Sequence, residues 1–104
     1  MTRMQAVYNG TVIAESNRTQ KVEGNHYFPR TDVLEAYLRP SRMKSLCFWK
    51  GLASYHDVEV GGVRDPNAAF YYPRPSPLAR RIRDHVAFWH DVEVRPAPPT
   101  STSW

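Results

Sequence analysis

The sequence predicts a mainly β domain built from short strands, with one or two short helices. β-Branched and aromatic residues alternate with polar residues over short runs, and the turn-forming pairs Asn-Gly and Gly-Gly separate some of these runs. This alternation is typical of half-buried strands, and nine prolines among 104 residues disfavour long helices. A chain of this length forms one domain, which we expect over residues 1–95, followed by a Pro-, Ser- and Thr-rich tail over 96–104.

The first quarter of the chain is expected to form a meander of short strands. Asn9-Gly10 favours a type I′ turn within a hairpin over residues 6–14, which is the strongest local signal in the sequence. Another strand is expected over 19–23. Residues 26–28 follow as an extended segment, because Pro29 disfavours the helical region for the residue before it.

Two short helices are predicted. Between Thr31, a candidate N-cap, and Pro40, a helix breaker, apolar residues recur at helical spacing over one or two turns. A second and better helix is expected after Ser76, whose capping hydroxyl precedes Pro77 at the first helical position. Its apolar stripe consists of Leu78, Ile82 and Val86.

The middle of the chain is expected to form two extended segments that meet at Gly51. Alternation of side chains then puts Cys47 and Trp49 on one face and Lys50 on the opposite face. Gly61-Gly62 is expected to turn the chain later on, and the last strand is expected to follow the second helix directly. The strands predicted after Gly51 cover residues 53–60, 67–72 and 86–94.

The pentapeptide His-Asp-Val-Glu-Val occurs twice, beginning at His56 and at His90. We interpret the copies as two strands with the same amphipathic pattern rather than as a duplicated half-domain. Each histidine then lies on a valine face, where a core imidazole is expected in preference to a ligand or proton-transfer role. The carboxylates are interpreted as charged outer surfaces, although two such pairs brought together could bind a divalent cation.

Composition excludes several classes of protein. A single cysteine forms neither an internal disulfide nor a zinc knuckle, and no cofactor or metal site is indicated. No apolar run approaches the roughly 18 residues that a membrane span requires, and no signal peptide is recognisable. We therefore expect a cytoplasmic protein without a membrane contact, and the sequence leaves open whether it is a monomer or a homodimer.

The net charge of +4 bears on the choice of partner. Basic residues cluster within 39–44 and within 74–83, yet no run reaches the five or six like charges of a binding tail. An arginine-rich solvated surface is the simpler interpretation, so nucleic acid is the less expected partner. A protein or nucleic-acid interaction module that uses these arginine faces is kept as the alternative function.

A small-molecule site around Gly51 is the first functional hypothesis. Aromatic and polar groups are crowded there, and a lysine before a glycine offers positive charge where a ligand can approach closely. The cysteine is interpreted as a buried, inert thiol, with a reactive thiolate as the alternative. The sequence does not decide whether a reaction is catalysed and identifies no catalytic residue. The expected ligand-binding residues are Cys47, Trp49, Lys50, Tyr55 and Tyr72.

Four stretches of the sequence resemble the bacterial domain of unknown function 427 family, and the resemblance extends to about residue 94. They cover residues 26–33, 47–55, 67–73 and 86–89. The central motif of the family, Cys-Pro-Tyr-Lys-Gly followed by Ala-x-Tyr, is matched at Cys47, Lys50, Gly51, Ala53 and Tyr55. Three positions depart from the family pattern and stay apolar or aromatic, namely Phe48, Trp49 and Phe70.

The resemblance implies a compact β-tent-like domain of two antiparallel sheets that meet at an angle, similar to methionine sulfoxide reductase B and the drug-binding domain of cereblon. Many relatives of this architecture hold zinc on paired Cys-x-x-Cys motifs, which this chain lacks, so no metal is carried over. The family is sometimes labelled nucleotidyltransferase-like, but no Gly-Ser phosphate loop accompanies the acidic pairs here. A shared fold transfers no activity by itself.

Overall fold

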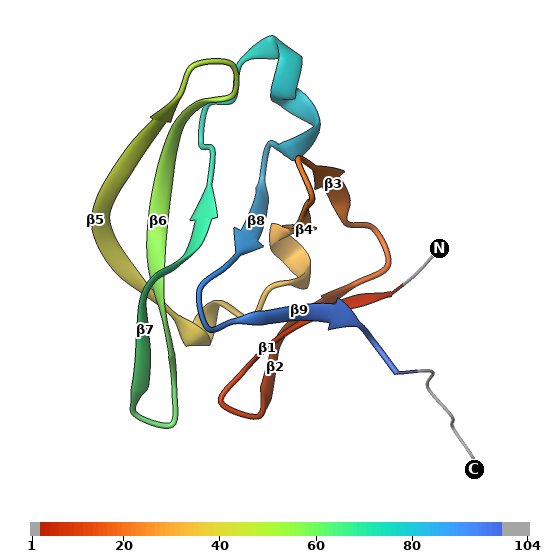
Figure 1. Cartoon of the computed structure of the whole chain (residues 1–104), viewed down its shortest axis with the longest axis vertical. Coiled ribbons are helices and arrows are strands. Elements are labelled where there is room, and N and C mark those ends of the chain that lie inside the picture. The colour runs from red at the N-terminus through yellow and green to blue at the C-terminus, as the bar shows by residue number, and fades with distance from the viewer. Residues whose placement is uncertain (1–2, 99–104) are drawn as a thin grey trace.

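The computed structural model describes residues 3–98, which form two antiparallel sheets and a few helical turns (Figure 1). This confirms the predicted mainly β fold. The smaller sheet has the order β2-β1-β9 and the larger one β3-β4-β8-β7-β6-β5. No helix among these residues is long and apolar enough to cross a membrane. The strands are β1 (Met4–Tyr8), β2 (Thr11–Ser16), β3 (Gln20–Val22), β4 (Asn25–Pro29), β5 (Leu38–Cys47), β6 (Gly51–Val60), β7 (Val63–Tyr71), β8 (His85–Phe88) and β9 (Glu93–Pro96). The 3₁₀ helices are η1 (Arg30–Asp32), η2 (Glu35–Tyr37) and η3 (Pro77–Ile82).

The predicted N-terminal hairpin is confirmed. β1 and β2 pair with Tyr8 opposite Thr11. Asn9 and Gly10 between them have φ values of +49° and +75°, the left-handed values that a type I′ turn requires. The Asn9 side-chain amide donates to the carbonyl oxygen of Val60 at 3.1 Å, which ties this hairpin to the far end of β6.

The other hairpins largely follow the prediction. β3 pairs with β4 across a turn at Glu23-Gly24, and β6 pairs with β7 across Gly61-Gly62. β7 begins before the predicted strand over 67–72. β5 pairs with β6 alone and forms an edge of the larger sheet, and its register shifts between Pro40 and Lys44.

The predicted helices are wrong in form. Thr31 caps no helix, because two separate 3₁₀ turns, η1 and η2, replace the continuous segment, and Pro40 lies inside β5. Ser76 makes no side-chain cap, and η3 is a 3₁₀ helix. Leu78 is exposed and Val86 belongs to β8, so the expected apolar stripe does not form. Segments this short gain too little hydrogen bonding to offset α-helix nucleation, and 3₁₀ turns take their place.

The predicted final strand is divided between the two sheets. β8 ends at Phe88 and pairs with β4 and β7, whereas β9 begins at Glu93 and pairs with β1. Between them His90 has φ of +57°, which is not a strand conformation, so the second pentapeptide copy begins in a turn. Alternation continues across the break because the valine and phenylalanine side chains on both sides of it, Val86, Phe88, Val92 and Val94, pack into the same apolar cluster. β9 ends at Pro96, and residues 99–104 of the expected tail lie outside the described residues.

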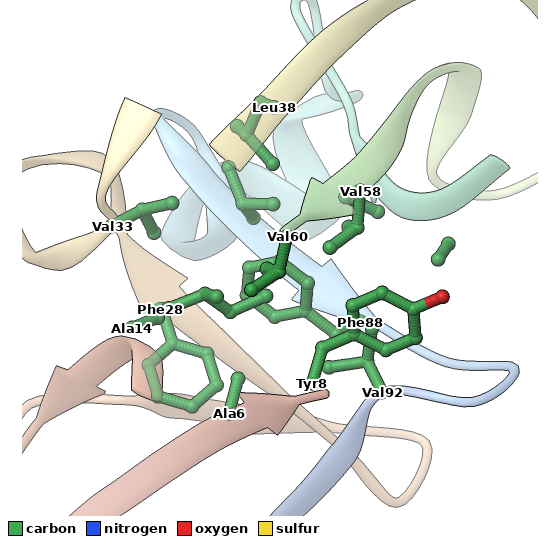
Figure 2. Packing of buried hydrophobic residues seen from close by; sticks show 14 of the residues in the cluster. Ala6, Tyr8, Ala14, Phe28, Val33, Leu38, Val58, Val60, Phe88 and Val92 are labelled. Carbon is green, nitrogen blue, oxygen red and sulfur yellow. The ribbon is translucent and has the colours of Figure 1, made fainter. Parts of the chain in front are cut away.

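Each face of the larger sheet carries an apolar cluster. Phe28, Val58 and Phe88 belong to the cluster between the two sheets, where side chains from both sheets point toward one another (Figure 2). Sequence neighbours such as Tyr27 and Ala87 point the other way, since side chains alternate along strands. They join a second cluster, which we call the outer cluster. It consists of Val22, Tyr27, Ala53, Tyr55, Phe70, Tyr72, Ala79, Ile82 and Ala87.

Candidate functional site

The structure brings the five predicted site residues together at the outer cluster. Tyr55 and Tyr72 are buried within it, and Cys47 and Trp49 pack against it. The Lys50 ammonium lies 5.4 Å from the ring centroid of Trp49 and 5.4 Å from that of Tyr72, within the distance of a cation–π interaction. The site is thus an aromatic cluster with one ammonium group against it.

Lys50 reaches this position because the chain turns earlier than predicted. β5 ends at Cys47 and β6 begins at Gly51, so the residues between them form a turn and do not alternate. The prediction that Lys50 lies on the face opposite Cys47 and Trp49 is therefore wrong. Gly51 has φ of +115°, a conformation that residues with a Cβ rarely adopt, and it directs the chain into β6.

The segment after β7 holds this turn in place. The Ser76 backbone N–H donates to the carbonyl oxygen of Lys50 at 2.9 Å, and the Ser76 hydroxyl donates to the carbonyl oxygen of Trp49. The carbonyl oxygen of Arg74 lies 3.1 Å from the position that a Cβ would take on Gly51. We call these contacts the clasp. Figure 1 shows η3, which follows the clasp, beside the β5–β6 turn at the top of the view.

Sequence reasoning missed the counterion of Lys50. The Lys50 side chain is 7% exposed and forms an ion pair with Glu23, whose side chain is 50% exposed. The Trp49 indole N–H donates to the second carboxylate oxygen of Glu23 at 3.3 Å. Glu23 lies in the β3–β4 turn, and β3 and β5 are opposite edges of the larger sheet. The ion pair therefore depends on the curvature of the sheet, for which the sequence gives no local signal.

The surroundings keep Lys50 and Glu23 charged. Hydrogen bonds from Lys50 and then from Trp49 lower the pKa of the Glu23 carboxyl. Burial lowers the pKa of Lys50, but the hydrogen bond to Glu23 and the nearby tyrosines outweigh it and raise that pKa overall. Burial also raises the pKa of Tyr27 to about 12 and raises that of Tyr72, so both phenols stay protonated at neutral pH. The Tyr27 hydroxyl has no hydrogen-bond partner among the described residues.

The rings of the outer cluster pack against one another. Tyr27 packs edge-on against Phe70, with ring centroids 5.9 Å apart, and Tyr55 lies 5.9 Å from the same ring. Among the surface hollows in the described part of the chain, four have volumes of about 220 to 320 Å³, and none of these four is lined by a predicted site residue. A ligand at Lys50 would therefore occupy the place that the carboxylate of Glu23 holds.

The histidines of the repeated pentapeptide lie in different environments. His56 is half-buried and stacks on Tyr71 with ring centroids 5.0 Å apart, and its Nε2 lies 3.4 Å from the Arg30 guanidinium. Burial and then the charge of Arg30 lower the pKa of His56. His90 is exposed in the turn before β9, so the prediction of a core imidazole is wrong there.

The carboxylates of the first pentapeptide copy pair with arginines. Asp57 and Glu59 both form ion pairs with Arg64, and Glu59 also pairs with Arg39. In the second copy, the backbone N–H of Asp91 donates to a carboxylate that lies outside the repeat, in β7. Within residues 3–98, no three His, Cys, Asp or Glu side chains are grouped so that they could hold a metal ion.

The contribution of the Lys50–Glu23 ion pair to stability is expected to depend on pH. Because the folded-state pKa of Glu23 lies below its ordinary value of 4.5, this contribution is complete above that value and is lost as the pH falls through the folded-state pKa. Urea unfolding is expected to show that Glu23→Gln is less stable than the wild type at neutral pH, and that the gap closes on acidification. A gap that persists below the folded-state pKa would contradict this assignment.

Fold and site together define a small β domain in which a nearly buried lysine lies against an aromatic cluster. A family model described as a domain of unknown function, DUF427, matches residues 1–96. The chain belongs to this DUF427 family, and the resemblance seen in the sequence is confirmed. No curated protein matches the chain.

Proposed function

We propose that this domain binds a small anionic ligand at Lys50, in the place of the Glu23 carboxylate. One observation carries the proposal: a lysine side chain that is only 7% exposed is neutralised by a carboxylate that is 50% exposed. A desolvated ammonium needs a counterion, because an uncompensated buried charge is strongly destabilising. A half-exposed glutamate can rotate into water, so a ligand carboxylate can take over this role without a change in the fold.

The surroundings of Lys50 favour an anion that carries a flat apolar group. The Trp49 indole N–H, which donates to Glu23, is a second donor for a ligand oxygen. The ammonium lies against the rings of Trp49 and Tyr72, and the partly exposed Trp49 ring offers an apolar surface to the remainder of the ligand. Tyr55 belongs to the same cluster, and Cys47 packs against it. The proposed ligand class is therefore aromatic carboxylates, and no catalytic role is assigned.

Benzoate is the probe for this proposal, and the signal to follow by NMR is the Trp49 indole N–H. Benzoate is expected to shift this resonance saturably in the wild type. Glu23→Gln removes the competing carboxylate and is expected to bind benzoate about tenfold tighter, which corresponds to about 1.4 kcal/mol. Lys50→Met is expected to abolish binding.

Glu35→Gln is the matched control. Glu35 pairs with Arg30, and its side chain is 53% exposed, close to the value for Glu23, so this variant removes an equivalent carboxylate away from Lys50. It is expected to bind benzoate like the wild type. The proposal is wrong if Glu23→Gln binds benzoate no tighter than Glu35→Gln does. This comparison does not require Lys50→Met to fold.

A further inference from the structure

Two hollows beside the clasp gather basic side chains. One hollow, of about 260 Å³, is lined by three arginines and two prolines. The other, of about 280 Å³, shares Pro73 and Arg74 with the first and adds a lysine. The two hollows share the lining residues Pro73 and Arg74, and we refer to the pair together as the cationic trough. Its basic residues are Lys44, Arg74, Arg80 and Arg83.

No carboxylate neutralises these four residues in the described part of the chain. The ion pairs formed by residues 3–98 use other basic residues, on both sheets and in the turns. Lys44 donates a hydrogen bond to the Ser54 hydroxyl at 2.8 Å, which leaves its charge uncompensated. Like charges along one trough raise the local potential and favour an anion with several charges. Guanidinium groups also match phosphate oxygens in bidentate geometry.

An exposed apolar surface borders the trough. Leu46 lies opposite Leu52 across β5 and β6, both are exposed, and Leu52 itself lines the second hollow. In the turn directly beyond this pair, Phe48 is 97% exposed. A groove of positive charge beside an accessible aromatic ring is the combination that binds single-stranded nucleic acid, in which phosphates follow the groove and bases stack on the ring.

We propose that the cationic trough binds the backbone of single-stranded nucleic acid, with a base stacked on Phe48. The basic residues belong to two sequence clusters that look like ordinary surface when read along the chain. The fold places Lys44 from the first cluster in the same hollow as Arg74 from the second. These cations line concave surfaces, which suit the phosphates of a strand better than a flat lipid headgroup layer.

The test is fluorescence anisotropy with a labelled oligothymidylate of about 15 nucleotides, within the range of site sizes for such proteins. Wild-type binding is expected to weaken steeply between about 50 and 200 mM salt. Arg74→Ala/Arg80→Ala is expected to bind at least about tenfold more weakly and to lower the slope of log K against log salt by about 1.4, that is, about 0.7 for each lost phosphate contact. Phe48→Leu keeps an apolar side chain and is expected to lose about fivefold or more in affinity through lost stacking.

Arg3→Ala/Arg95→Ala is the matched control, because it also removes two positive charges. Arg3 lies next to the smaller sheet and Arg95 lies within it. It is expected to bind nearly as tightly as the wild type. Absence of oligothymidylate binding by the wild type, an equal loss in both arginine variants, or unchanged binding by Phe48→Leu would each overturn the proposal. Binding to phosphatidylserine vesicles without binding to the oligonucleotide would also overturn it and assign the trough to membranes. Neither Lys50 nor Glu23 lines the trough, and the two proposals use different probes and variants, so this proposal and the benzoate site fail independently.

Discussion

Replacing Phe28 by alanine is expected to lower the free energy of unfolding by about 3–5 kcal/mol. Phe28 is 0% exposed and packs edge-on against Phe88 with ring centroids 5.7 Å apart, in the cluster between the two sheets. Truncation removes both the buried area and the ring contact, and it leaves a cavity that two paired sheets cannot easily close. Because domains of this size are stable by about 5–15 kcal/mol in total, the variant is expected to unfold at a much lower urea concentration, measured by circular dichroism.

Phe48→Ala is the control for this prediction. The same residue type is removed, but Phe48 is 97% exposed in the β5–β6 turn. Its replacement is expected to change the free energy of unfolding by no more than about 0.5 kcal/mol. Equal losses for the two phenylalanines would show that the packing between the sheets has been assigned incorrectly.

Replacing Gly51 by alanine is expected to cost about 2–5 kcal/mol of stability. Two terms contribute: about 1–2 kcal/mol for a Cβ on a residue with positive φ, and about 1–3 kcal/mol for overpacking. The overpacking arises because the new methyl group would lie 3.1 Å from the backbone carbonyl oxygen of Arg74. A backbone atom held by the clasp cannot move aside as the end of a flexible side chain can.

Gly62→Ala separates the two terms. Gly62 has φ of +81°, but a Cβ built there meets nothing within 4 Å. This variant is expected to lose only about 1–2 kcal/mol from backbone strain. If Gly51→Ala is no less stable than Gly62→Ala in urea unfolding, the clasp does not constrain the turn.

The parts of the fold that local sequence determines were predictable. The Asn9-Gly10 hairpin is confirmed because its turn conformation and its flanking strands both depend on adjacent residues. The division of the final strand was not predictable. A period of two appears on both sides of His90, and alternation alone does not say which sheet a strand joins. The expected helix after Ser76 forms as a 3₁₀ helix without a side-chain cap, because the Ser76 hydroxyl donates to the carbonyl oxygen of Trp49, a residue distant in sequence.

The sequence predicted which residues lie together around Gly51, but it did not predict the counterion of Lys50. Crowding of polar and aromatic residues around Gly51 was enough to select residues that the fold brings together. The partner of Lys50 is Glu23, at the opposite edge of the larger sheet, and only the three-dimensional curvature of that sheet makes them neighbours. The cationic trough combines Lys44 of β5 with arginines that follow β7, two strands away in the larger sheet, a pairing that depends on strand order.

The position of β5 at the border of the larger sheet bears on self-association. Its outer side presents unpaired backbone groups, which in many proteins recruit a strand from another molecule. Here Pro40 offers no N–H, the register is broken before Lys44, and both Arg42 and Lys44 carry exposed positive charge. An incoming strand would meet a missing donor, an irregular backbone and positive charge, so fibre-like growth through this border is disfavoured.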